Sequence, residues 1–206
     1  MSKRAPARAS WYEPYFLFMI LAALGLGTLM LEQPARLALL WTALAVFGVF
    51  YRSGQKVEMS FSLPSVGRGL LLGLVIAVPL LAFLSGPLRS FNETLYGTSD
   101  VVYLFYQVCF VSAPVEEFFF RGILQQSKGL SVSTGLYGLT LLLFFLPHTP
   151  ILVALLVFLA LGILGLAYGY VAEKHGLSAA IACRLVVGLL VQVSPSLFVV
   201  LRKLFA

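Results

Sequence analysis

The sequence predicts an all-helical integral membrane protein, from its apolar composition, the lengths of its apolar runs and the positions of its charges. Hydrophobic residues make up 60% of the 206 positions and charged residues only 11%. A typical soluble domain carries about 25% charged residues. The chain therefore lacks the polar surface that water requires, whereas a helix in lipid satisfies its own backbone hydrogen bonds.

Apolar runs of about membrane length follow one another along the whole chain. A crossing helix needs about 20 apolar residues, so the length allows about eight crossings with short loops and no separate soluble domain. We expect a single integral membrane domain over residues 1–206. The expected segments are 13–31, 37–51, 69–86, 101–127, 132–147, 150–171, 177–193 and a short last one at 196–206.

Basic residues outside the apolar runs are concentrated in alternate loops. Of the 14 Lys and Arg residues, ten fall on one side, and two, Arg36 and Arg89, fall on the other. The positive-inside rule then predicts that both termini are cytoplasmic, and we expect a bacterial inner (plasma) membrane. Because the net charge of +6 is spread over loops, we expect a lipid bilayer as partner and no nucleic acid.

Three ionisable side chains lie inside one apolar segment, 101–127. Each costs about 2.5–3.5 kcal/mol at membrane depth, so such residues indicate a function. Glu117 and Arg121 are four residues apart and can pair on one helix face. Glu116 points about 100° away from Glu117 around the helix. One carboxylate is therefore left without a partner in its own helix, and it is the candidate for chemistry.

A possible partner for this carboxylate stands at the end of the next segment. His148 follows Pro147, and a glutamate and a histidine together can hold and deprotonate a water molecule. Zinc needs three or four protein ligands, and His148, Glu116 and Glu117 form only a marginal set. We therefore expect no metal and no cofactor. Counted along the helices, Glu116 and His148 differ in depth by roughly 10 Å, which kinks at Pro114 and Pro147 would have to close.

These residues carry a family resemblance. The run Pro114-Val-Glu-Glu-Phe-Phe-Phe-Arg-Gly122, followed by Phe144-x-x-x-His148, resembles the CAAX-processing and bacteriocin-processing (CPBP, or Abi) family of intramembrane glutamate proteases. The resemblance covers about residues 100–195. It implies a helical fold around a polar chamber in which a glutamate and a histidine activate water to cleave a peptide. A myxosortase-like protein-sorting branch is the specialised form that we favour.

The sequence departs from the family at its third motif, where a histidine and an asparagine or aspartate are usual. Arg184 and Gly188 stand at these positions. A guanidinium is always charged and offers several donors to an oxyanion, so Arg184 can replace the histidine, and we expect it to approach Glu116 or Glu117. Alternatively, the site is degenerate. A third possibility is that Cys183, beside Arg184, acts as a thiolate nucleophile.

The resulting hypothesis is an endopeptidase that cleaves a membrane-associated protein or peptide, for example a C-terminal tail. Glu116 is its base, His148 helps to hold the water, and Arg184 binds the oxyanion. Glu117 and Arg121 brace the site. One alternative is a catalytically silent family member that binds a peptide as an immunity or scaffold protein. A proton-coupled transporter is less favoured, because the sequence lacks the inverted repeats that such proteins carry.

Overall fold

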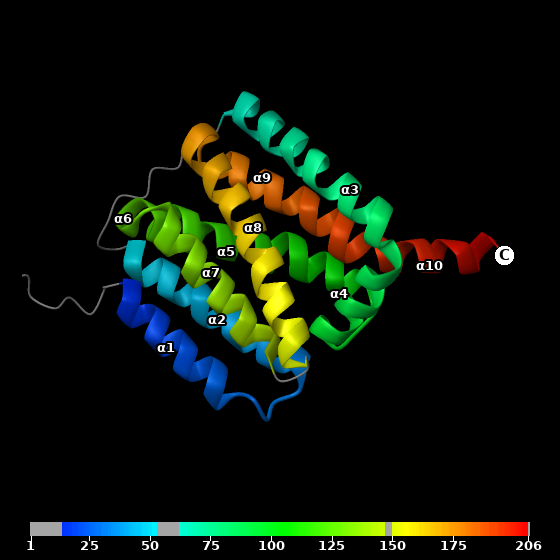
Figure 1. Cartoon of the computed structure of the whole chain (residues 1–206), viewed down its shortest axis with the longest axis horizontal. Helices are drawn as coiled ribbons and strands as arrows, with labels where there is room; N and C mark the ends of the chain where they lie inside the picture. The colour runs from blue at the N-terminus through cyan, green and yellow to red at the C-terminus, as the bar shows by residue number, and fades with distance from the viewer. Residues whose placement is uncertain (1–13, 53–61, 147–149, 206) are drawn as a thin grey trace, which may run out of the picture.

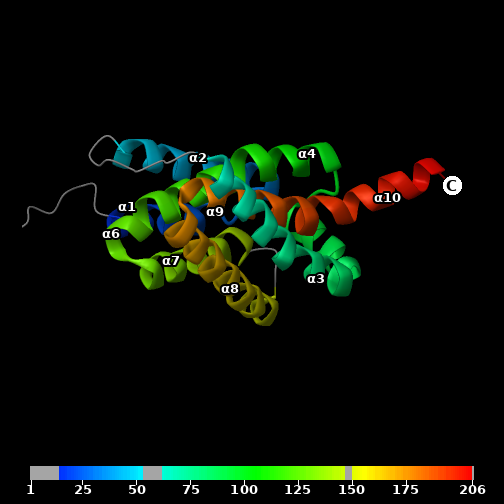
Figure 2. The same cartoon turned by 90° about the horizontal axis from the view of Figure 1, so that it is seen from above.

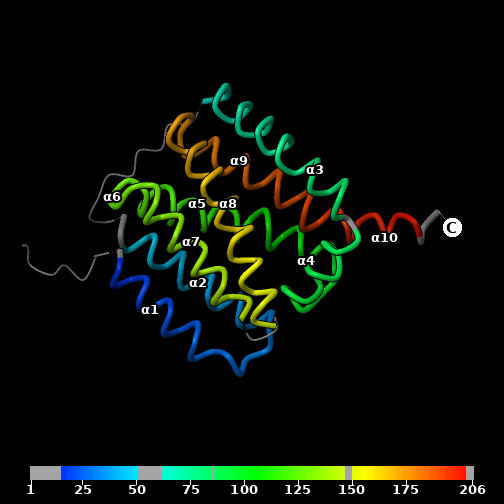
Figure 3. Tube along the Cα trace, in the orientation of Figure 1, coloured from blue at the N-terminus to red at the C-terminus, as the bar shows by residue number. Residues whose placement is uncertain are grey.

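The computed structural model describes residues 14–52, 62–146 and 150–205, and all regular structure in these ranges is helical. The expected site residue His148 lies outside the described residues. The helices pack side by side with their axes roughly along one direction, and consecutive long helices run in opposite directions (Figures 1 and 3). The prediction of an all-helical fold is confirmed.

The described part of the chain divides into ten α-helices and three π-helical segments. In chain order they are α1 (Pro14–Gly27), α2 (Gln33–Arg52), α3 (Leu63–Tyr96), α4 (Val101–Tyr106), η1 (Gln107–Ser112), α5 (Ala113–Glu117), η2 (Phe118–Gln125), α6 (Gln126–Lys128), α7 (Leu130–Phe145), α8 (Ile151–His175), α9 (Leu177–Gly188), η4 (Leu189–Val193) and α10 (Ser194–Phe205).

Five helical stretches in the described ranges are long and apolar enough to cross a membrane: Gln33–Phe50, Leu63–Leu84, Val101–Lys128, Ile151–His175 and Leu177–Arg202. Two shorter apolar stretches, Tyr15–Gly27 and Leu130–Phe145, accompany them. Their outward faces carry large apolar side chains, such as Phe83 at 85% exposure and Ile163 at 68%. Such surfaces are unfavourable in water and suited to lipid.

The last two expected segments form one continuous helix, from α9 through η4 to α10. Pro195 does not end it, although a proline cannot donate a hydrogen bond to the carbonyl four residues earlier. The amide of Asn92, buried on α3, donates instead to the carbonyl of Val191 at 2.9 Å and to that of Gln192 at 3.2 Å. As a result, α10 leaves the bundle at the end opposite to the start of α1 (Figures 1 and 2).

Small residues allow α3 and α9 to lie in close contact. A Cβ atom added to Gly73 would lie 2.8 Å from the carbonyl oxygen of Cys183 and from Cβ of Val186. Close backbone approach through small residues is a usual way to pack helices in lipid, where apolar burial gives no driving force. This contact fixes α9, which carries Arg184, against α3.

Arg36 is fully buried, although its position predicted a loop charge on the outer side. Its guanidinium donates to the carbonyls of Gly25 at 2.8 Å and Leu143 at 2.5 Å, and also to that of Phe144. These carbonyls lie at the C-terminal ends of α1 and α7, where helix hydrogen bonds run out and the dipole favours a cation. Arg36, which lies on α2, thus links the C-terminal ends of α1 and α7.

The hydrogen bonds of Asn92 predict a measurable stability effect. Asn92→Leu keeps the side-chain volume but leaves the carbonyl of Val191 without its donor, so we expect a loss of about 1–3 kcal/mol in unfolding free energy. Unfolding in mild detergent, followed by circular dichroism, measures it. Thr94→Val is the matched control, because Thr94 is exposed on the same helix. Equal stability of Asn92→Leu and the control would contradict the assignment.

Candidate active site

The two glutamates lie on α5, a short α-helical stretch between the π-helical segments η1 and η2. Both side chains are buried, with 1% of Glu116 and none of Glu117 exposed. A π-helical turn holds an extra residue and is found preferentially at functional sites. The sequence predicted one segment over 101–127 with a kink at Pro114, and the π-helical segments could not be foreseen from residue spacing.

Glu116 is held by donors from two other helices. The indole Nε1 of Trp41 on α2 donates to Oε1 at 2.9 Å, and Nη2 of Arg184 on α9 donates to Oε2 at 3.2 Å. Arg184 is itself buried, with 4% exposed. The expectation that Arg184 approaches one of the two glutamates is therefore confirmed for Glu116.

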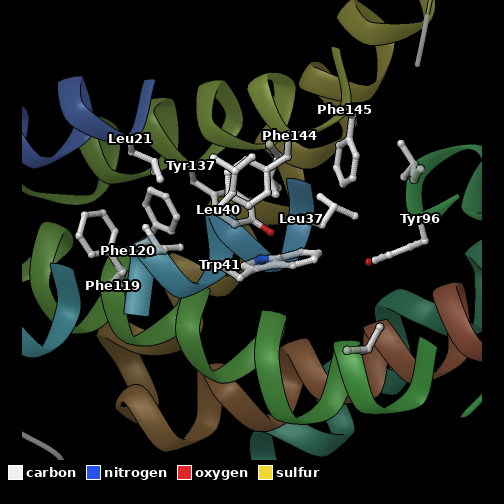
Figure 4. Packing of buried hydrophobic residues seen from close by; sticks show 14 of the residues in the cluster. Leu21, Leu37, Leu40, Trp41, Tyr96, Phe119, Phe120, Tyr137, Phe144 and Phe145 are labelled. Atoms are coloured by element: carbon white, nitrogen blue, oxygen red, sulfur yellow. The ribbon is translucent and has the colours of Figure 1, made fainter. Parts of the chain in front are cut away.

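Sequence reasoning missed Trp41. Its ring stacks on Tyr96 at a centroid distance of 6.3 Å and meets the ring of Phe144 edge-on at 5.6 Å (Figure 4). Tryptophan in membrane proteins gathers at the two interfaces, so a tryptophan in the middle of the segment 37–51 was a signal that could have been used. A buried indole N–H usually has a partner, and here the partner is Glu116.

Glu117 pairs with Arg121 as their four-residue spacing predicted. The distance from Nε of Arg121 to Oε2 of Glu117 is 3.4 Å, and both side chains are almost completely buried. Nη2 of Arg121 also donates to the carbonyl of Gly165 on α8 at 2.8 Å. The guanidinium carbon lies 4.2 Å from the ring centroid of Tyr137, a cation–π distance. Arg121 thus links α5, α7 and α8.

Gly165 makes room for this arrangement. A Cβ atom at this position would lie 2.8 Å from a ring carbon of Tyr137 and 3.3 Å from Nη2 of Arg121. Any larger residue must therefore displace the aromatic ring or the guanidinium. The glycine belongs to the site, although nothing in its sequence context separates it from the other glycines of α8.

Cys183 and Gly188 flank Arg184 on α9. Cys183 is a free, fully buried thiol in an apolar cluster with Ala77, Tyr168 and Val187. A buried cysteine of this kind usually behaves as a small apolar residue. Gly188 offers no side chain to the site, and a Cβ atom there would lie 3.8 Å from Nη1 of Arg184. The donor at the third motif is thus Arg184.

A cavity of about 160 Å³ reaches Glu116 and Arg184. Apart from these two residues, its lining is mostly apolar and comes from α2, α3, α7, α8, α9 and η4. An apolar groove of about 600 Å³ between α3 and α8 adjoins the cavity, and the two share the lining residues Leu84, Leu88, Phe91, Val157 and Ala160. Glu116 thus lines a cavity next to the apolar flank of the bundle.

The structure brings five of the six expected site residues into one region: Glu116, Glu117, Arg121, Cys183 and Arg184. The sixth, His148, cannot be placed, because it lies outside the described residues. Within the ranges that the structure describes, no group of three or more His, Cys, Asp or Glu side chains could hold a metal ion.

The buried pair of Glu117 and Arg121 predicts a large, non-additive stability effect. Arg121→Met leaves a buried carboxylate without its countercharge and should cost about 3–5 kcal/mol in unfolding free energy. Adding Glu117→Gln should recover part of this loss, because the uncompensated charge is removed. A double-mutant cycle on unfolding in detergent measures the coupling. Additive effects of the two substitutions would show that the pair is not coupled.

Comparison with known proteins agrees with this geometry. Residues 98–190 match the family model for type II CAAX prenyl endopeptidase Rce1-like proteins. No curated protein and no solved structure matches the chain. The matched segment contains Glu116, Glu117, Arg121 and Arg184, and together with the five candidate spans it indicates a membrane protein of a protease family. Over residues 98–190, the chain is therefore similar to the Rce1-like family of CAAX-type proteases.

Proposed function

We propose that the chain is an intramembrane glutamate endopeptidase with Glu116 as its general base. The observation that carries this proposal is the buried Glu116 carboxylate between Trp41 and Arg184 at the wall of a cavity. A buried charge at this depth is costly and needs a function. The cavity leaves space beside the carboxylate for a peptide group and a water molecule.

The chemistry starts when a substrate carbonyl enters the cavity and competes with Glu116 for Arg184. Once Arg184 turns to the carbonyl oxygen, Glu116 keeps only the hydrogen bond from Trp41, and its second oxygen is free to face a water molecule. Glu116 then takes a proton from water while the water oxygen attacks the carbonyl carbon, and Arg184 stabilises the oxyanion. When the intermediate collapses, the C–N bond breaks and the leaving amine takes the proton from Glu116.

The neighbouring residues support these steps. Glu117 and Arg121 hold α5 against α7 and α8 and so fix the direction of Glu116. Trp41 keeps one oxygen of Glu116 in place throughout. His148 is proposed to hold the attacking water, as the family resemblance implies. A polar chamber then forms around Glu116 when substrate and water are bound.

The substrate class that fits this site is a membrane-associated peptide or a C-terminal tail with apolar side chains. The groove between α3 and α8 is apolar and leads to Glu116. The family name points to prenylated CAAX tails, whereas the replacement of the third-motif histidine by Arg184 favours a specialised sorting-tail branch. We therefore propose tail processing by one domain over residues 1–206.

The arrangement of the helices also supports a topology. The five candidate spans together with α1 and α7 correspond to seven crossings rather than about eight, because α9 and α10 form one helix. The end of the bundle that carries Lys128 and Lys174, where α1 also begins (Figure 1), is proposed to be cytoplasmic under the positive-inside rule. Seven crossings then put the two termini on opposite sides of the membrane, and this proposal replaces the expectation that both termini are cytoplasmic. The proposed membrane remains the bacterial inner membrane.

The direct test is Glu116→Gln in protein reconstituted into liposomes. We expect cleavage to fall at least about 10³-fold, because an amide cannot accept the proton from water. The probes are a prenylated CAAX peptide and a peptide with an apolar tail followed by basic residues, with products identified by mass spectrometry. Glu93→Gln is the matched control, because Glu93 pairs with Arg89 on the exposed face of α3. Undiminished cleavage by Glu116→Gln would refute the proposed base.

The same assay separates the alternatives. A silent, peptide-binding member would retain both peptides without cleaving either, and Glu116→Gln would bind them equally well. A transporter would move protons across the liposome membrane, which a pH-sensitive dye inside the liposomes detects. We favour catalysis because Arg184 supplies a cationic donor at the third-motif position.

Two substitutions on α9 distinguish the proposed roles of Arg184 and Cys183. Arg184→Ala should lower kcat by about 10²–10³-fold, as expected for the loss of an oxyanion donor. Cys183→Ala should leave kcat within about twofold, since a buried thiol in an apolar cluster has no part in the proposed steps. Cleavage assays under saturating substrate measure both. A severe loss in Cys183→Ala alone would instead favour the thiolate mechanism.

A further inference from the structure

A second, polar pocket lies at the other end of the glutamate-bearing helix. It measures about 400 Å³ and is bounded by η2, α6 and α7 on one side and by α8 and α9 on the other. Arg121, Gln125, Gln126 and Glu173 contribute polar groups to its lining. We call this pocket the vestibule. The vestibule lies at the turns next to Lys128 and Lys174. The apolar groove lies toward the other end of the bundle, where it is lined by the C-terminal half of α3 and the N-terminal half of α8.

One face of η2 connects the vestibule with the glutamate pair. Glu117, Arg121 and Gln125 follow at four-residue intervals along it. On the facing helix α8, Arg121 donates to the carbonyl of Gly165 at 2.8 Å, and Gln125 donates to that of Gly169 at 2.9 Å. The three polar side chains therefore form a column against a glycine-bearing face of α8. The column spans roughly 10 Å along the helix axis.

Polar atoms along this column lack hydrogen-bond partners among the described residues. They are Nη1 of Arg121, Oε1 of Gln125, both carboxylate oxygens of Glu117, Oγ1 of Thr134 and the hydroxyls of Tyr137 and Tyr168. Buried polar groups in native proteins are almost always satisfied by protein or by ordered water. A cluster of such groups beside a pocket is the setting in which buried water is held. Water is therefore the group that fits the column.

We propose that the vestibule and the column of Glu117, Arg121 and Gln125 form the route by which water reaches Glu116. This inference rests on the proposed function, since hydrolysis consumes one water molecule per cleaved bond. The apolar groove is a poor path for water, because its lining offers few hydrogen bonds. The peptide and the water thus reach the site from different sides of the molecule.

Arg121 occupies the narrow part of this route. Its guanidinium is 98% buried, lines the vestibule and is paired with Glu117. With Nη1 without a hydrogen-bond partner, it can pass a water molecule from the vestibule to the carboxylate of Glu117, whose oxygens accept no hydrogen bond among the described residues and which directly follows Glu116 in the chain. Arg121 thereby admits single water molecules while its ring contacts with Tyr137 and Tyr168 keep the passage closed to larger solutes.

Hydroxyl-radical footprinting in detergent tests the route without any substrate. Radiolysis of water next to a buried side chain oxidises that side chain, so Tyr137 and Tyr168 should be labelled although neither is exposed. Phe119 is the internal control, since it is equally buried and packs on Phe120. We expect Ala172→Trp, which fills the vestibule, to reduce labelling of both tyrosines at least threefold. Leu166→Trp places the same indole side chain on the exposed face of α8 and should change nothing.

Because Ala172→Trp could fail to fold, a second variant is used in which the vestibule is blocked only after the protein has folded. Ala172→Cys is prepared with Cys109→Ser and treated with a water-soluble sulfonate thiol reagent. Modification at position 172 should proceed and should then reduce labelling of Tyr137 and Tyr168 as the tryptophan does. If the tyrosines are labelled no more than Phe119, or if blocking the vestibule leaves their labelling unchanged, the route is refuted.

The labelling experiment can refute the water route without refuting the proposed function, and the reverse also holds. Labelling requires no cleavage, so loss of labelling in Ala172→Trp supports the route even if Glu116→Gln proves active and the proposed base is wrong. Conversely, cleavage that depends on Glu116 but persists at full rate in Ala172→Trp refutes the route and leaves the protease intact. If both proposals hold, Ala172→Trp lowers kcat and leaves KM unchanged.

Discussion

The ion pair between Glu116 and Arg184 is the constraint on which the rest of the structure depends. Its two opposite charges lie 3.2 Å apart, deep in an apolar bundle. Each compensates the cost of burying the other, and a buried charge without a countercharge would strongly destabilise the fold. The pair joins α5 to α9, and the close packing of Gly73 holds α9 against α3. The glycine contact positions α9, and the indole of Trp41 with the aromatic cluster around it (Figure 4) positions the Glu116 carboxylate, so that the pair forms in the structure without substrate.

Contacts between site residues on the same helix could be predicted from the sequence. Contacts between residues far apart in the chain could be predicted only where a buried charge requires a countercharge. Glu117 and Arg121 are neighbours on one helix, so their spacing alone predicted the pair. Arg184 was expected near a glutamate because a buried guanidinium needs a countercharge, although spacing did not say which one. Trp41 is 75 residues from Glu116, and its hydrogen bond depends on how α2 packs, which no local pattern encodes.

Most helices were predicted within about four residues where apolar runs and loops alternate, but α3 (Leu63–Tyr96) is much longer than the expected segment 69–86. Helix ends were also wrong where a distant side chain compensates a local break. Pro195 marks a helix end by its own chemistry, yet Asn92 supplies the donor that the proline lacks, and the helix continues. A guanidinium in lipid needs hydrogen-bond acceptors, and the local sequence around Arg36 offers none. Arg36 was therefore predicted to be a charge in a loop. The exposed carbonyls at the ends of α1 and α7 provide the acceptors.

The hydrogen bond from Trp41 has a consequence for how the protein can be divided into parts. The segment that matches the family runs from residue 98 to 190, but the donor to Glu116 lies far upstream, on α2. A fragment cut at the borders of sequence similarity would therefore lose one hydrogen-bond donor to the buried carboxylate of Glu116. Engineering, transplantation or split-protein designs based on this scaffold have to carry α2 along, and chimaeras that exchange it between relatives exchange part of the surroundings of Glu116.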